Sequence, residues 1–139
     1  MAYWLVKSEP DAYSWDQQVA DGVTAWTGVR NHSAKLNLLA MKKGERAFFY
    51  HSNEGKEVVG VVEVVREAFP DPTAEEGSPW VSVDMKAVAP MPVPVTLAAM
   101  KAEPKLEGLA LIRMSRLSVS PVSAAHWKVI CAMGGLKPA

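Results

Sequence analysis

The sequence predicts one α+β domain, in which a strongly curved mixed β-sheet or open β-barrel is flanked by short helices. β-prone and helical runs are mixed along the 139 residues without a regular strand–helix–strand repeat, which argues against a doubly wound parallel sheet. Hydrophobic residues make up 49% of the chain and charged residues 22%, as in globular proteins that bury a core. The length suits a single domain over residues 1–139, because no stretch resembles a linker between two domains.

The first elements that the sequence predicts are a strand and a short helix. Residues 3–7 are β-prone and lead into a turn that contains proline, which is typical of a short strand. Ser14 and Gln17 have the spacing of a capping box, in which each side chain binds the backbone of the other residue. A helix over residues 15–20 is therefore expected, with Gly22 at its end.

A second helix is predicted over residues 31–41. Asn31 or Ser33 can serve as its N-cap, because either side chain can accept a hydrogen bond from a free backbone N–H of the first turn. Gly44 would stop the helix. Three apolar residues share one helical face and are expected in the core: Ala34, Leu38 and Met41.

A β-hairpin and a further strand are predicted next. Residues 46–52 and 58–68 are β-rich, and the connection at residues 53–56, Asn-Glu-Gly-Lys, favours a tight turn. Residues 69–79 are acidic and rich in proline and glycine, so a surface loop is expected there. Residues 80–88 alternate between apolar and polar side chains, as a half-buried strand does.

The C-terminal third is predicted to hold two helices and two short strands. Prolines at alternate positions impose an extended path over residues 90–94, after which Thr96 caps a short helix. Residues 109–112 and 116–119 are candidate strands. A last helix is expected to follow Ser123, with Trp127 in the core as for Trp4 and Trp15.

The charges sum to zero but are unevenly distributed. Residues 67–84 carry five acidic side chains and no basic one, whereas residues 85–139 carry seven basic side chains and two acidic ones. A neutral chain is not expected to hold long nucleic acid through phosphate neutralisation alone, because that needs many lysine and arginine contacts. The basic third can still form a local patch for an anion, or can be a solvated surface with chance clustering.

The sequence predicts a cytoplasmic protein without a metal or a cofactor. The most apolar stretch, residues 58–65, is interrupted by Glu63 and is far shorter than the roughly 20 residues of a membrane span. The single cysteine, Cys131, fits a reducing compartment. The three histidines are scattered without carboxylates at ligand spacing, and no glycine-rich phosphate loop occurs. A monomer is the default expectation.

Aromatic and polar residues gather near the ends of predicted elements and form the candidate site. They lie in residues 7–10, 26–31 and 50–52 and at three further positions: Arg113, Arg116 and Ser118. Single nucleic-acid bases are recognised by stacking on an aromatic ring and by hydrogen bonds to their edges. The hypothesis requires the Trp26 indole to be left uncovered, and packing of this ring in the core is the alternative.

These motifs, taken in order, closely resemble the EVE domain family. The matching segments span nearly the whole chain: Trp4-Leu-Val-Lys-Ser-Glu-Pro10, Trp26-Thr-Gly-Val-Arg-Asn31, Phe48-Phe-Tyr-His-Ser52, Val59-Gly60, Trp80-Val-Ser-Val-Asp84 and Arg116-Leu-Ser-Val119. EVE domains are PUA-like, so the resemblance implies a curved, partly closed β-barrel with flanking helices. It also implies binding of a modified base in DNA or RNA, with 5-methylcytosine and its oxidised form proposed for animal members.

The resemblance extends to YTH domains, which bind N6-methyladenine in an aromatic cage, and it implies roles for individual residues. Trp26 would be a wall of the base pocket, and its polar contacts would come from Lys7, Ser8, Asn31 and Ser52. The rim or the phosphate contacts would come from Arg30, Arg116, Ser118, Glu9 and His51. Residues 69–80 offer only Phe69 and Trp80 as aromatics, so this chain departs from the YTH cage there.

A non-catalytic module that binds one flipped-out base is the favoured interpretation. The alternative is a small hydrolase acting on a modified nucleobase or nucleoside, as some PUA-like relatives of the ASCH type are, with Lys7 and Glu9 as base and acid. No set of nucleophile, base and orienting group is recognisable in the sequence, which disfavours the enzyme. A third interpretation is a protein-interaction module, expected if side chains fill the pocket.

Overall fold

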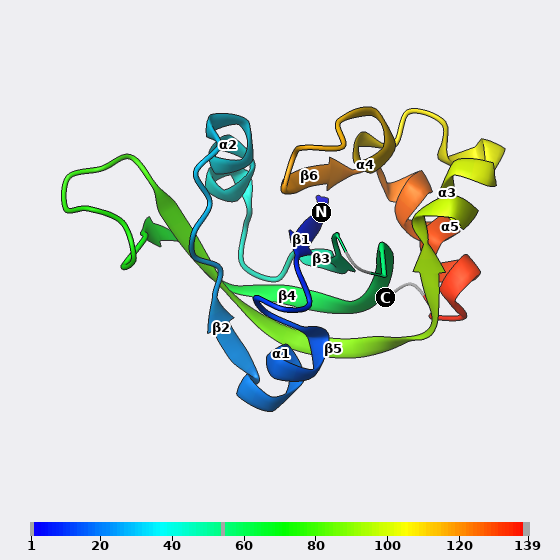
Figure 1. Ribbon diagram of the computed structural model, residues 1–139, viewed down its shortest axis with the longest axis horizontal. Helices are drawn as coiled ribbons and strands as arrows, with labels where there is room; N and C mark the ends of the chain where they lie inside the picture. The colour runs from blue at the N-terminus through cyan, green and yellow to red at the C-terminus, as the bar shows by residue number, and fades with distance from the viewer. Residues whose placement is uncertain (1, 54, 138–139) are drawn as a thin grey trace.

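The computed structural model describes residues 2–53 and 55–137 and contains a six-stranded mixed sheet (Figure 1). The strands are β1 (Tyr3–Ser8), β2 (Val23–Ala25), β3 (Arg46–His51), β4 (Glu57–Pro70), β5 (Val81–Thr96) and β6 (Val119–Val122). Their order across the sheet is β2-β5-β4-β3-β1-β6. β1 and β3 run parallel, and the other neighbouring pairs are antiparallel. The predicted α+β class with a curved, open sheet is confirmed.

Short helices cover both faces of the sheet. They are α1 (Trp15–Asp21), α2 (His32–Ala40), α3 (Leu97–Ala102), the 3-10 helix η1 (Pro104–Leu106), α4 (Ala110–Arg113) and α5 (Ala124–Gly134). Helices α1 and α2 pack on one core, and the helices of the C-terminal third pack on the other. None of the helices within residues 2–53 and 55–137 has the length and apolar character needed to cross a membrane.

Alternation along the central strands divides the apolar side chains between two cores. In β1, Trp4 and Val6 enter the core under α1 and α2, while Leu5 enters the other. In β3, Phe49 belongs to the first core and Phe48 to the second. Successive side chains of a strand point to opposite faces, so a strand buried on both sides reads as a continuous apolar run. Burial on both faces therefore explains why β3 is a continuous β-prone run without alternation between apolar and polar residues.

Irregular pairing bends β4 and β5, the two longest strands. Their register shifts at four places, and bulges of this kind increase local bending and twist. Gly60 lies at one of these shifts and faces Trp15 of α1. A Cβ atom at Gly60 would lie 2.5 Å from the indole, so α1 can approach the sheet only over a glycine.

Replacing Gly60 with alanine is expected to lower the free energy of unfolding by roughly 1–3 kcal/mol, because the added methyl group overlaps the Trp15 ring. Urea denaturation followed by circular dichroism measures the loss. The double variant with Trp15→Leu supplies the control, since a smaller side chain makes room for the methyl group. The double variant should then lose less free energy of unfolding than the two single variants lose in sum. If the losses in free energy of unfolding were strictly additive, residue 60 and residue 15 would not clash.

Most predicted elements are confirmed. The helix at α1 has the capping box of Ser14 and Gln17, and α2 has Asn31 as its N-cap. The three apolar residues predicted on one face of the second helix are fully buried: Ala34, Leu38 and Met41. The predicted hairpin turn at residues 53–56 includes residue 54, which lies outside the described residues.

Three predictions about local structure are wrong. Residues 109–112 were expected as a strand, but Ala110–Arg113 is helix α4, because a four-residue apolar run does not distinguish a strand from a buried helical turn. The strand expected at residues 116–119 instead occupies Val119–Val122, where Pro121 is tolerated at the edge of the sheet. The expected loop at residues 69–79 begins only after β4 ends at Pro70.

Candidate functional site

A hollow of about 360 Å³ opens beside β2 and the end of β1. Its lining comes from three stretches of the chain, namely the end of β1, the turn before α1, and β2 with the two residues that follow it. The lining residues are Lys7, Ser8, Ala12, Tyr13, Thr24, Ala25, Trp26 and Thr27. We call this space the first hollow. It brings together three of the residues that the sequence predicts in a base pocket: Lys7, Ser8 and Trp26.

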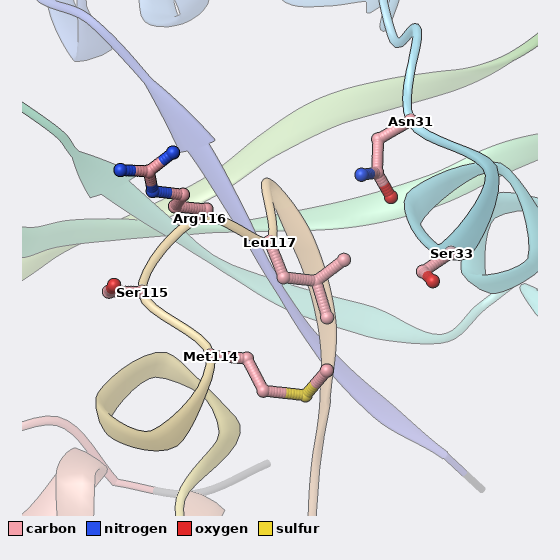
Figure 2. Close-up of a pocket in the computed structure, with 6 residues that line it drawn as sticks. All are labelled: Asn31, Ser33, Met114, Ser115, Arg116 and Leu117. Atoms are coloured by element: carbon pink, nitrogen blue, oxygen red, sulfur yellow. The ribbon is translucent and has the colours of Figure 1, made fainter.

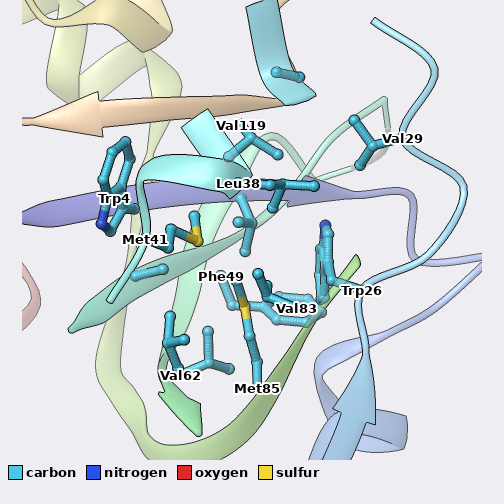
Figure 3. Close-up of a cluster of buried hydrophobic side chains, with 14 of the residues drawn as sticks. Trp4, Trp26, Val29, Leu38, Met41, Phe49, Val62, Val83, Met85 and Val119 are labelled. Atoms are coloured by element: carbon cyan, nitrogen blue, oxygen red, sulfur yellow. The ribbon is translucent and has the colours of Figure 1, made fainter. Parts of the chain in front are cut away.

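The expectation that the Trp26 indole is left uncovered is wrong: only 7% of the residue is exposed, and it belongs to the first core. Its ring meets Phe49 edge to face at 5.5 Å and Tyr13 at 6.4 Å. Figure 3 shows it at the side of the first core away from Trp4. Burying most of an indole is strongly favourable, which explains why the ring is not left open. Trp26 also lines the first hollow, so the residue belongs both to the core and to the lining of this space.

Lys7 places a cation at the edge of the first hollow. Its ammonium group donates a hydrogen bond to the carbonyl oxygen of Ser115 at 2.6 Å, and its backbone N–H donates to the carbonyl of Ser118. Burial lowers the pKa of Lys7 below its ordinary value of 10.5. An ammonium group has three N–H donors, so two remain for a ligand.

Ser8 links the first hollow to its support. Its hydroxyl donates to the Tyr13 carbonyl at 2.6 Å, which holds the turn between β1 and α1. Its own carbonyl accepts a hydrogen bond from the backbone N–H of Ser52. The oxygen of a hydroxyl that donates can still accept a hydrogen bond, so Ser8 remains able to contact a ligand.

A second hollow, also about 360 Å³, lies between the start of α2 and the segment after α4 (Figure 2). It is lined by Asn31, Ser33, Met114, Ser115, Arg116 and Leu117. Asn31 caps α2 by accepting from Ala34 at 3.0 Å, and Figure 2 shows its amide nitrogen on the side of Arg116. Arg116 is exposed and forms no ion pair within the described part of the chain. The predicted site residues are thus divided between two hollows.

The two hollows meet at the hydrogen bond between Lys7 and Ser115. Lys7 lines the first and Ser115 lines the second, and the Lys7 ammonium donates to the Ser115 carbonyl at 2.6 Å. Trp26 and Arg116 therefore line two spaces that are linked by one direct contact.

Asp71 holds the segment of residues 26–31 in place. Its carboxylate accepts from the Gly28 N–H at 2.8 Å, from Arg30 at 3.0 Å, and from both the backbone and the hydroxyl of Thr73 at 2.7 Å. Burial alone would raise the pKa of Asp71, but the hydrogen bonds from Thr73, Gly28 and Arg30 outweigh it and hold the pKa at about 2. Arg30 is therefore paired with Asp71, whereas Arg116 has no ion-pair partner in the described part of the chain.

The Asp71 carboxylate is expected to make the free energy of unfolding depend on pH in the acid range. The pKa of Asp71 is about 2 in the folded protein against an ordinary value of 3.8, so the unfolded chain takes up the proton first as the pH falls. The ionised Asp71 carboxylate therefore contributes about 2 kcal/mol to the free energy of unfolding. This contribution is complete well above pH 3.8 and is lost as the pH falls toward 2. Urea denaturation of the wild type and of Asp71→Asn measures it. The stability gap between the two proteins should shrink across this range, and a constant gap would contradict the assignment.

Four other predicted residues support the site without lining either hollow. The Nε2 atom of His51 accepts from the backbone N–H of Trp15 at 3.0 Å at the start of α1, and burial lowers the pKa of His51. Ser52 and Ser118 pair through their backbones with Ser8 and Lys7. Glu9 has an exposed side chain, and its carbonyl accepts from Ala12 and Tyr13 in the turn.

Several lining residues were not predicted. Thr24 and Ala25 lie in β2, a three-residue strand that is too short to show a periodic pattern. Tyr13 directly precedes the helix cap at Ser14, and this adjacency was the only signal for it. Thr27 lies within residues 26–31 of the candidate site, but no role was predicted for it.

The chemistry of the two hollows suits binding. The Lys7 ammonium contacts a backbone carbonyl, and the exposed Glu9 side chain does not line the first hollow with it. Among residues 2–53 and 55–137, no group of three or more His, Cys, Asp or Glu side chains is arranged to hold a metal ion. The arrangement offers an aromatic wall, a cation with unused donors and an unpaired guanidinium.

Comparison with known proteins identifies close relatives. The EVE domain model matches residues 2–133. A solved structure from Rhodopseudomonas palustris is 62% identical with a TM-score of 0.92, covering 100% of this chain and 97% of that one. Thymocyte nuclear protein 1 from Homo sapiens is 31% identical over 170 residues, which cover 99% of this chain and 76% of the human protein. The resemblance stated from the sequence motifs is confirmed.

Two solved complexes are also similar. The structure of human thymocyte nuclear protein 1 with DNA containing 5-methylcytosine has a TM-score of 0.90 and 30% identity, covering 99% of this chain and 100% of that one. A YTH domain from Zygosaccharomyces rouxii, solved with N6-methyladenosine RNA, has a TM-score of 0.59 at 12% identity over 99% of this chain and 89% of that one. At this identity the YTH similarity shows the fold alone.

Proposed function

The chain belongs to the EVE domain family, and from this premise we propose that it binds nucleic acid by holding one modified base, turned out of its strand, in the first hollow. The observation that carries the proposal is the fixed aromatic wall of Trp26 beside the unused donors of Lys7. The complex of the human relative with DNA containing 5-methylcytosine supports it, because that protein covers 99% of this chain at 30% identity.

The first hollow suits a flat heterocycle. Trp26 and Tyr13 supply aromatic walls, and Phe49 behind Trp26 fixes the orientation of the indole before any ligand arrives. A wall that is already ordered adds little entropy cost on binding. The donors of Lys7 match carbonyl oxygens or ring nitrogens on the edge of a base. A methyl group on the base gains about 1 kcal/mol by burial against such walls.

The second hollow suits the strand that carries the base. Arg116 has no ion-pair partner in the described part of the chain and lies beside the polar groups of Asn31, Ser33 and Ser115. Arginine and small polar side chains are the usual partners of phosphate oxygens, which position a strand without reading its sequence. The base and the adjoining phosphate would then lie on either side of the Lys7–Ser115 contact.

The proposed role is binding without catalysis. A hydrolase would need a group that activates a nucleophile, and no Asp or Glu of the described residues lines either hollow. The basic and aromatic lining is fully accounted for by recognition of a base and a phosphate. A monomeric protein in the cytoplasm remains our expectation from the sequence.

The proposal is tested by fluorescence anisotropy with labelled single-stranded pentanucleotides that carry one central base. Four probes are compared: 5-methylcytosine, N6-methyladenine and the two unmodified parents. We expect one modified probe to bind roughly fivefold more tightly than its parent, the gain from burying one methyl group. Equal affinities within both pairs would contradict recognition of a modified base.

A further inference from the structure

A third hollow, of about 310 Å³, lies between Arg30 and the loop that joins β4 to β5. This loop projects at the left edge of Figure 1. The hollow is lined by Arg30, Thr73, Ala74, Glu75, Ser78 and Trp80. Neither the first nor the second hollow includes any of these residues, so this is a separate space.

Trp80 gives the third hollow an aromatic wall. The ring is half-buried and lies against His32 with their centroids 4.8 Å apart. The guanidinium carbon of Arg30 is 5.9 Å from the ring centroid, within reach of a cation–π contact. Arg30 is held by the buried Asp71 at 3.0 Å and contacts Thr73 at 3.3 Å. The aromatic wall and its neighbouring cation are therefore ordered in advance.

One short segment borders all three hollows. Thr27 lines the first, Asn31 the second and Arg30 the third. The Cα atoms of Thr27 and Arg30 are at most about 11 Å apart, because an extended chain spans no more than ~3.6 Å per residue. A strand that places one base in the first hollow can thus reach the third within a few nucleotides.

The charges at the third hollow favour a base over a phosphate. Glu75 lines it, and Glu76 follows in the same loop, so the loop repels an anion. The charge of Arg30 is already matched by Asp71, whereas Arg116 in the second hollow has no ion-pair partner among residues 2–53 and 55–137. An aromatic ring with a carboxylate nearby suits the face and the amino group of a nucleobase.

We propose that the third hollow receives a neighbouring base of the same strand, stacked on Trp80. This inference rests on the proposed function, because it assumes that a modified base occupies the first hollow. The protein would then contact the modified base and a neighbouring base of the strand at the same time. Stacking tolerates different bases, so the contact adds affinity with little dependence on sequence.

The test compares two pentanucleotides that carry the modified base preferred in the anisotropy experiment, one with normal neighbours and one with abasic neighbours. The wild type is expected to bind the normal strand roughly tenfold more tightly, and Trp80→Ala should reduce this ratio to about one. Trp80→Phe keeps an aromatic face and should retain most of the ratio. Thermal unfolding of each variant checks that the fold is kept. If the alanine variant unfolds, Trp80→Leu carries the test, because leucine keeps apolar bulk without an aromatic face and should also reduce the ratio to about one.

The outcomes separate the two proposals. If the wild type distinguishes modified from unmodified strands but Trp80→Ala keeps the full preference for normal neighbours, the third hollow does not hold a base. A wild type with no preference for normal over abasic neighbours has the same consequence. If the wild type does not distinguish modified from unmodified strands at all, the proposed function fails and this inference fails with it.

Discussion

Replacing Trp26 with alanine is expected to abolish measurable binding of the modified base and to lower the free energy of unfolding by roughly 3–5 kcal/mol. The two effects have one cause, because Trp26 is only 7% exposed and belongs both to the core and to the lining of the first hollow. Removing it takes away the aromatic wall and leaves a cavity against Phe49. Anisotropy with the modified pentanucleotide measures binding, and urea denaturation measures stability.

A matched variant separates the loss of the wall from the loss of stability. Trp26→Phe keeps a buried aromatic ring but shortens it, so the contact with the base should weaken roughly tenfold while the fold is kept. Trp127→Phe makes the same change in the other core, where the residue is 2% exposed and lines neither the first nor the second hollow. It should lower stability and leave affinity unchanged. Folded Trp26 variants with the affinity of the wild type would contradict the role of this ring.

Replacing Lys7 with methionine is expected to weaken binding by roughly 10- to 100-fold, as loss of hydrogen bonds from a charged group does. Methionine keeps an unbranched apolar stem but removes the ammonium group, and with it the contact with Ser115 and the two unused donors of this residue that lines the first hollow. Stability should change little, since that contact is exposed. Lys101→Met is the control, because this exposed lysine lies on α3, away from the first two hollows. An equal effect of both substitutions would point to general loss of charge instead of a specific contact.

The fold could be predicted from the sequence where local signals agreed with the tertiary structure. The capping box at Ser14 and the N-cap at Asn31 set the start of α1 and α2. The β-rich runs around residues 46–52 and 58–68 became β3 and β4. Local signals failed for β2 and α4, which have three and four residues, because their conformation depends on pairing with β5 and on burial of Leu111. Short elements carry too little periodicity to be identified alone.

The candidate site was predictable in its residue types but not in its geometry. Lys7 and Trp26 were identified from the sequence and line one hollow. Asn31 and Arg116, identified with them, line another, and the two hollows are linked by the contact of Lys7 with Ser115. That contact joins residues 108 positions apart, and no local pattern indicates it. Burial of the Trp26 ring is likewise set by its contact with Phe49 of β3.

Asp71 shows how a residue outside the predicted site shapes it. In the sequence it is one of five acids in a stretch without bases, which reads as a solvated loop. In the structure its side chain is fully buried and binds Gly28 and Arg30, so it orders the segment that borders all three hollows. The acidic loop therefore positions the basic and aromatic residues that are proposed to contact the ligand.

The most direct test of the central claim follows the indole N–H signals of the 15N-labelled protein by NMR during titration with the modified pentanucleotide. We predict that the Trp26 signal moves saturably with the modified strand, while the Trp127 signal in the other core stays in place. Saturable binding that leaves the Trp26 signal unchanged would contradict the placement of the base in the first hollow.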